Sequence, residues 1–211
     1  MLLAVFGGTG GTGTHLIRQA LDRGHHVAAL ARRPEAMRLA HPRLRVVRGD
    51  VVVPGAADPV VEGADAVLSA LGIGYRRHAT TVYSAGTGNI LAAMGRAQVR
   101  RLLVVSTSSL SVPDPGRPVE WAVARLILQP LLRRPYADMA LMEQRIRKSG
   151  TDWTVARAAR LTNGSGGRPY RTAVDSRLPG CWSVSRADLA SYLLDHIWDH
   201  RVCRATMEIA Y

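Results

Sequence analysis

Lysine and phenylalanine are almost absent from this chain of 211 residues. It has one lysine, Lys148, one phenylalanine, Phe6, and only 5% aromatic residues. No apolar run approaches the roughly 18 residues that a membrane span needs, and the first residues lack the basic region of a secretory signal. The two cysteines, Cys181 and Cys203, have neither CxxC spacing nor paired histidines nearby. We therefore expect a cytoplasmic protein with no membrane partner, no metal site and no disulfide.

Acidic residues are also few, and the balance of charge is strongly basic. The chain has 16 aspartates and glutamates but 28 lysines and arginines, which gives a formal net charge of +12. The arginines lie in small groups along the chain instead of forming one basic tail. This distribution favours a solvated basic surface over a nucleic-acid face, and we expect no nucleic-acid partner. An anionic small ligand is a third explanation of the charge.

Apolar runs alternate with helix-like stretches along the whole sequence. This rhythm predicts one α/β domain over residues 1–211, a doubly wound parallel sheet of the Rossmann type with a small elaborated C-terminal region. The expected strands are 2–6, 26–30, 44–47, 65–70, 101–106, 153–157 and 206–210. The expected helices are 14–22, one opening at Pro34, one before Gly63, 84–96, 121–132, 136–148 and 186–200, with loops through Pro113, Pro115 and Pro118 and through 163–167.

A glycine-rich loop follows the first expected strand directly. Gly7, Gly10 and Gly13 satisfy the spacing GxxGxxG, and Gly8, Gly10 and Gly13 satisfy GxGxxG. The loop ends a strand and opens a helix, so backbone amides without neighbouring side chains can approach a pyrophosphate at the helix N-terminus. The pattern predicts a dinucleotide site. The candidate contacts in this loop are Gly7, Thr9, Gly10, Gly11, Thr12 and Gly13.

The end of the second strand indicates which dinucleotide binds. NAD sites place an Asp or Glu there for the ribose 2′-hydroxyl, whereas this chain has Arg32 and Arg33. Two guanidinium groups can bind a 2′-phosphate, which favours NADPH, although two solvated surface arginines are a second interpretation. Asp50 and Val51 follow the third strand, where the adenine edge is expected; Asp50 alternatively caps its loop. Further candidate contacts after the fourth and fifth strands are Ala70, Leu71, Gly72, Ser106 and Thr107.

The catalytic pair of ordinary short-chain dehydrogenases, Tyr-x-x-x-Lys, is missing. Tyr83 is followed four residues later by Thr87, and Tyr136 by Ala140. Lys148 does not have the required spacing from any tyrosine. Carbonyl reduction with a lysine-assisted tyrosine as the acid is therefore not expected.

With these features, the sequence resembles an atypical short-chain reductase group, the biliverdin-IXβ reductase/flavin reductase family and its NmrA-like relatives. The resemblance covers nearly the whole chain. Its segments are VFGGTGGTG at 5–13, VRGDV at 47–51, NILAAM at 89–94, VSTS at 105–108, SGTDWT at 149–154 and SRADLA at 185–190. The resemblance implies an NADPH-dependent reductase of flavins, quinones or linear tetrapyrroles, which are planar conjugated acceptors.

The resemblance also implies two catalytic positions. The family's serine matches Ser108, and its active-site histidine falls on Arg160, which can stabilise an anion but cannot donate a proton at neutral pH. Ser108 alternatively caps the strand end. A second pocket histidine falls near Met139, for which a core role is favoured. Two other functions remain open: a non-catalytic NADP sensor, and a ketoreductase or isomerase of secondary metabolism that uses Tyr83 or Tyr136.

Overall fold

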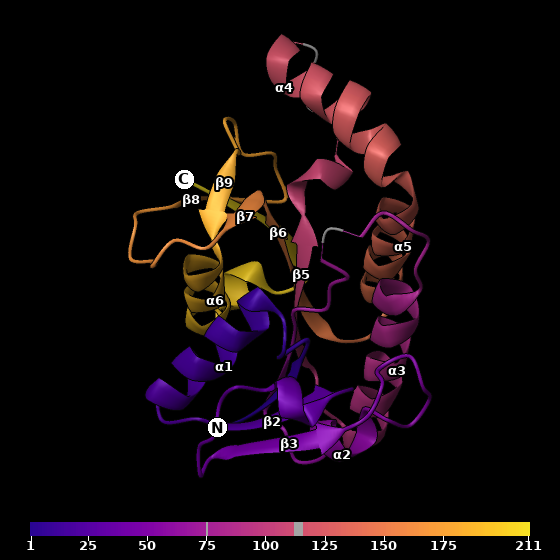
Figure 1. Cartoon of the computed structure of the whole chain (residues 1–211), viewed down its shortest axis with the longest axis vertical. Coiled ribbons are helices and arrows are strands. Elements are labelled where there is room, and N and C mark those ends of the chain that lie inside the picture. The colour runs from indigo at the N-terminus through magenta and orange to yellow at the C-terminus, as the bar shows by residue number, and fades with distance from the viewer. Residues whose placement is uncertain (75, 112–115) are drawn as a thin grey trace.

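Within residues 1–74, 76–111 and 116–211, which the computed structural model describes, eight strands form the central sheet (Figure 1). Their order is β3-β2-β1-β4-β5-β6-β10-β8, and all neighbours are parallel except β10 and β8. The predicted Rossmann-like fold is confirmed. The strands are β1 Leu2–Phe6, β2 His26–Ala31, β3 Leu44–Arg48, β4 Ala66–Ser69, β5 Arg101–Thr107, β6 Asp152–Ala158, β8 Arg171–Val174 and β10 Ala205–Ala210.

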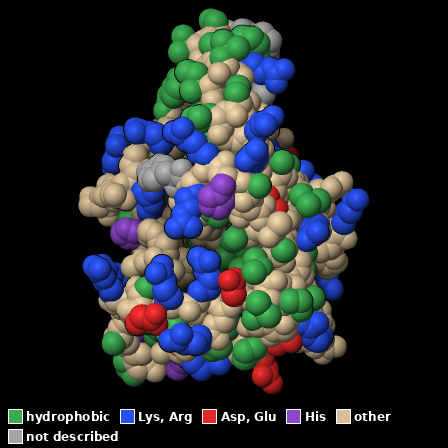
Figure 2. All heavy atoms as spheres, turned by 45° about the vertical axis from the view of Figure 1, so that its right-hand side comes forward, with side chains coloured by type: hydrophobic (Ala, Val, Ile, Leu, Met, Phe, Trp, Pro, Cys, Tyr) green, Lys and Arg blue, Asp and Glu red, His purple; other side chains and the backbone are tan. Residues whose placement is uncertain are grey.

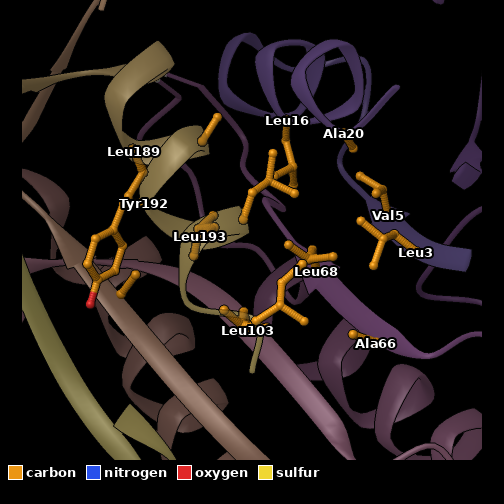
Figure 3. Close-up of a cluster of buried hydrophobic side chains, with 14 of the residues drawn as sticks. Leu3, Val5, Leu16, Ala20, Ala66, Leu68, Leu103, Leu189, Tyr192 and Leu193 are labelled. Carbon is orange, nitrogen blue, oxygen red and sulfur yellow. The ribbon is translucent and has the colours of Figure 1, made fainter. Parts of the chain in front are cut away.

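Helices cover both faces of the sheet (Figure 1). α1 (Gly11–Asp22) and α6 (Arg186–Asp195) pack on one face, while α2 (Asp58–Val61), α3 (Val82–Ala97) and α5 (Gln129–Lys148) pack on the other. Figure 3 shows the first of these layers, where Leu16 of α1 and Leu193 of α6 meet Leu68 and Leu103 of the sheet. All four side chains are fully buried, and each contributes roughly 1.5–3 kcal/mol through that burial.

The two helices predicted over 121–132 and 136–148 form one bent helical path. It runs through α4 (Pro118–Ala122), a π-helix (Val123–Leu128) and α5. The backbone leaves helical geometry at Leu132, at φ −112° and ψ 15°, because Pro135 inside α5 has no N–H to donate to the preceding turn. Residues 118–134, which we call the arm, project away from the body of the protein (Figure 1).

Several other elements differ from the expectations. The helix opening at Pro34 is a single 3-10 turn, Pro34–Ala36, because the next residues run extended and let Met37 and Leu39 pack against the core. α6 ends at Asp195 instead of residue 200. The C-terminal region adds β8 and a separate two-stranded parallel sheet of β7 (Arg160–Thr162) and β9 (Ser183–Ser185), which the sequence did not reveal. Pro113 and Pro115 lie outside the described residues.

Candidate functional site

A cavity of about 880 Å³ opens where the parallel strands β1, β2, β4, β5 and β6 end. Ligands of doubly wound sheets bind at this edge. Fifteen of the residues proposed from the sequence line the cavity: Gly7, Thr9, Gly10, Gly11, Thr12, Arg32, Asp50, Val51, Ala70, Leu71, Gly72, Ser106, Thr107, Ser108 and Arg160. Gly13 and Arg33 are outside the lining. The structure thus brings together residues that are up to 153 positions apart.

Backbone packing between glycines holds the first loop against the sheet. Gly7 has a φ of +81°, and a Cβ atom on it would lie 2.3 Å from the carbonyl oxygen of Ala70. A Cβ on Gly13 would lie 2.1 Å from the carbonyl oxygen of Gly7. The absence of a side chain at Gly13 therefore lets α1 pack closely against the loop after β1. Gly13 does not line the cavity, but this packing positions the loop residues that do.

The start of α1 faces the cavity and lacks a side-chain cap. The N-cap residue is Gly10, which has no side chain to bond to the first amides, and the first turn has no acidic residue. These amides have no acceptor within the helix, and they form a positive end that favours an anion. Arg186 of α6 lies beside them, since a Cβ on Gly11 would be 2.6 Å from its Cδ atom. Its Nη1 donates to Oδ1 of Asn163 at 2.6 Å.

The far end of the same cavity contains the residues that follow β2 and β3. Arg32 is exposed, lines the cavity and has no ion pair with any described carboxylate. Arg33 is also exposed but immediately precedes the 3-10 turn, away from the lining. Asp50 lines the cavity, and its Oδ1 also accepts from the N–H of Val52 at 3.2 Å. Both interpretations of Asp50 are therefore compatible with its geometry.

Hydroxyl groups gather at the end of β5. Ser108 is buried and lines the cavity together with Cys181, whose thiol pKa is raised by burial. Tyr136 lines the cavity together with Thr107 and Ser109, and burial raises the pKa of its hydroxyl. No ammonium stands beside this phenol in the described part of the chain, because Ala140 occupies the position four residues further on.

A second cavity tyrosine, Tyr83, is held from α3. Its hydroxyl accepts from the N–H of Ile73 at 3.3 Å, and burial raises its pKa. Arg160, in β7, is exposed and lines the cavity next to Trp182. Met139 lines the cavity and also packs with Met142 in the core, so the two roles considered for it coexist.

A buried ion-pair network supports the floor of the cavity. Ser106 donates its hydroxyl to Oε1 of Glu143 at 2.7 Å. Oε2 of the same carboxylate accepts from Arg157 at 2.6 Å and from Arg147 at 3.0 Å. The Glu143 side chain is only 2% exposed, so these donors replace the water that burial removes from its carboxylate.

The arm forms an apolar roof. Four apolar arm residues line the cavity: Val123, Ala124, Leu128 and Leu132. The acidic arm residue Glu120 also lines it. The amide of Gln129 donates to the carbonyl oxygen of Ser109 at 2.9 Å, which fastens the base of the arm to the end of β5.

Residues 7–200 match a protein family described as NAD(P)H-binding. The chain belongs to this NAD(P)H-binding family. It is similar to a 3β-hydroxysteroid dehydrogenase/Δ5→4-isomerase of Mycobacterium tuberculosis, with 33% identity over 117 residues, 50% of this chain and 31% of the relative. The chain thus spans less than a third of that relative's length.

Solved structures share the fold of this NAD(P)H-binding protein. A short-chain dehydrogenase/reductase from Veillonella parvula, solved in complex with NADP, has a TM-score of 0.80 at 20% identity, covering 100% of this chain and 94% of that one. An oxidoreductase from Lactococcus lactis has a TM-score of 0.79 at 19% identity, covering 100% and 90%. At these identities the likeness shows the fold alone.

The residues present fit an NAD(P)H dinucleotide. Gly10, Gly11 and Thr12 present an uncapped helix start to the cavity, as a pyrophosphate requires, and Arg32 and Asp50 lie toward the adenosine end. Sequence reasoning missed Arg186 and Glu143 as site residues. Arg186 stands in the SRADLA segment, which was a usable signal, whereas Glu143 has no local sequence signal.

Proposed function

We propose that the protein is an NADPH-dependent reductase that transfers hydride to a quinone, a flavin or another planar conjugated acceptor. The observation that carries this proposal is the composition of the cavity below the arm. Apolar side chains of the arm form its roof, hydroxyls and Arg160 line its side, and no described ammonium adjoins Tyr136. Such a pocket suits a flat apolar molecule whose reduction generates a delocalised negative charge.

The choice of NADPH rests on Arg32. Its guanidinium lines the cavity without a carboxylate partner, and charge-assisted hydrogen bonds to a 2′-phosphate suit it. The Veillonella neighbour, solved with NADP, is consistent with this choice.

In the proposed reaction, NADPH supplies the hydride when bound. The glycine loop and the start of α1 hold the pyrophosphate, and the arm excludes water from above the acceptor. Arg160 stabilises the negative charge that develops on an acceptor oxygen, and Ser108 donates a hydrogen bond to it. The proton that completes the reduction comes from solvent, so the chain needs no side-chain acid.

Steady-state oxidation of NADPH with a quinone series and with an aliphatic ketone tests this proposal. Arg160→Ala should lower turnover of quinones roughly ten- to a thousandfold, the range for loss of one electrostatic stabiliser, and Ser108→Ala should lower it less. Tyr83→Phe and Tyr136→Phe should remain active. Activity confined to the ketone, or lost in either tyrosine variant, would overturn the proposal.

A second candidate is a ketoreductase that uses Tyr136 as its acid. The position of Tyr136 favours it, since Tyr136 lines the cavity together with Thr107 and Ser109, which follow at the end of β5. Reduction of a ketone that disappears in Tyr136→Phe would support this candidate. Tight NADPH binding without turnover of any acceptor would instead indicate a sensor.

A further inference from the structure

The arm is apolar on the side that faces away from the cavity as well as on the side that lines it. Val119 is 66% exposed, Leu126 64%, Ile127 56% and Leu131 41%. Figure 2 shows the corresponding gathering of hydrophobic side chains at the end of the molecule where the arm projects. A contiguous exposed apolar surface of this kind typically marks a site that binds another molecule, so this outer face is a candidate docking surface.

The charges on the arm indicate what kind of partner fits. Residues 117–134 contain four arginines and one acidic residue, Glu120. Glu120 is bonded to Arg117 at 3.2 Å and its side chain is only 15% exposed. Arg125, Arg133 and Arg134 are exposed beside the apolar face.

This charge balance argues against a second copy of the chain as the partner. Two arms in contact would bring two sets of exposed arginines together, with no exposed carboxylate among residues 117–134 to separate them. An anionic surface, in contrast, is attractive to all three exposed arginines. Apolar residues flanked by arginine on one side of a helix are typical of segments that lie in the interface of a bilayer.

We propose that the arm docks on the surface of a bilayer that contains anionic lipids. Val119, Leu126, Ile127 and Leu131 enter the boundary between headgroups and acyl chains, and the neighbouring arginines bind lipid phosphates. The arm lies on the bilayer; none of the described helices is long and apolar enough to cross one. The sequence alone led to the expectation of no membrane partner, because periodicity could not show that these side chains are left uncovered.

Vesicle flotation of the full chain tests the docking without cofactor or acceptor, so its outcome does not depend on the proposed reductase activity. The two vesicle types are phosphatidylcholine alone and phosphatidylcholine mixed with an equal amount of phosphatidylglycerol. We expect binding to the mixed vesicles to be roughly tenfold or more tighter, and to weaken as salt is added.

Matched variants locate the contact. The double variant Leu126→Glu, Ile127→Glu should lose roughly tenfold or more of the binding, whereas Val53→Glu, at a side chain 52% exposed far along the chain from the arm, should bind as the wild type does. Arg133→Gln with Arg134→Gln should weaken only the preference for anionic lipid. Unchanged thermal unfolding of each variant establishes that it is folded.

Three outcomes would overturn the proposal. The first is no binding to the mixed vesicles at low salt. The second is full binding by the Leu126→Glu, Ile127→Glu variant, which would mean that the basic surface adsorbs without the arm. The third is a dimer detected by light scattering that the same double variant dissociates, which would make a second copy the partner of this face.

Discussion

Replacement of Arg32 by alanine should remove most of the preference for NADPH over NADH. Arg32 lines the cavity at the end of β2, whereas its neighbour Arg33 is outside the lining, although both are exposed. Arg33→Ala therefore removes the same charge from nearly the same place in the sequence and serves as the matched control.

The magnitude follows from the chemistry of the contact. A hydrogen bond to a charged group contributes about 1.5–3 kcal/mol, and solvent around an exposed guanidinium reduces this toward the lower limit. About 1.4 kcal/mol corresponds to a tenfold change in Kd. We expect NADPH to bind the wild type at least about tenfold more tightly than NADH, and Arg32→Ala to weaken NADPH by about tenfold while NADH is unaffected.

Titration calorimetry with both nucleotides on the wild type and the two variants measures these effects. Arg33→Ala should change the NADPH Kd by less than about threefold, under 1 kcal/mol. Added salt should weaken NADPH binding more in the wild type than in Arg32→Ala. Equal Kd values for the two nucleotides in the wild type, or a loss confined to Arg33→Ala, would refute the reasoning.

Three further predictions concern stability. Gly13→Ala should lower the free energy of unfolding, measured by urea denaturation, by about 2 kcal/mol or more, because its Cβ would lie 2.1 Å from a backbone oxygen. The control Gly95→Ala, whose Cβ would have nothing within 4 Å, should raise it by about 0.5–1 kcal/mol. Glu143→Gln should destabilise by about 3 kcal/mol in the same assay, since its amide would face a guanidinium and leave Arg157 partly unpaired; no change would mean that the network is replaceable. Burial raises the pKa of Glu208, so the stability this group contributes is complete below the unfolded pKa and is lost as pH rises through the folded pKa. The Tm of Glu208→Gln should therefore rise relative to that of the wild type as the pH is raised from about 4 to about 8, and the same Tm difference at both pH values would contradict this.

The nucleotide half of the site was predictable because its signals are local. Strand, glycines and helix start occupy one short segment, and Arg32 and Asp50 follow strands whose buried pattern is plain in the sequence. Their joint position then follows from the shared edge of a parallel sheet. Even there, the sequence could not show that Arg32 lines the cavity and Arg33 does not, since the two are adjacent arginines and both are exposed.

The contacts between residues far apart in the sequence, and the acceptor side of the cavity, could not be predicted to the same extent. Glu143 reaches Ser106 across 37 positions, and Arg186 reaches the start of α1 from the other end of the chain. Strands of three residues such as β7 and β9 are too short for an alternating pattern to stand out. The arm was expected as a helix over 121–132, separate from the one over 136–148, and its projection depends on the direction that the bend at Leu132 gives it, which no local pattern specifies.

The contact between Gly13 and Gly7 has a consequence for how the cavity can change over evolutionary time. Backbone atoms locked together in this way leave little freedom to lose on binding, so the phosphate-binding part is preorganised before a nucleotide arrives. The arm, in contrast, continues into α5 and is tied to the sheet edge by the hydrogen bond from Gln129 to Ser109. Substitutions in the arm can therefore alter which acceptor is received while the tightness of nucleotide binding stays the same.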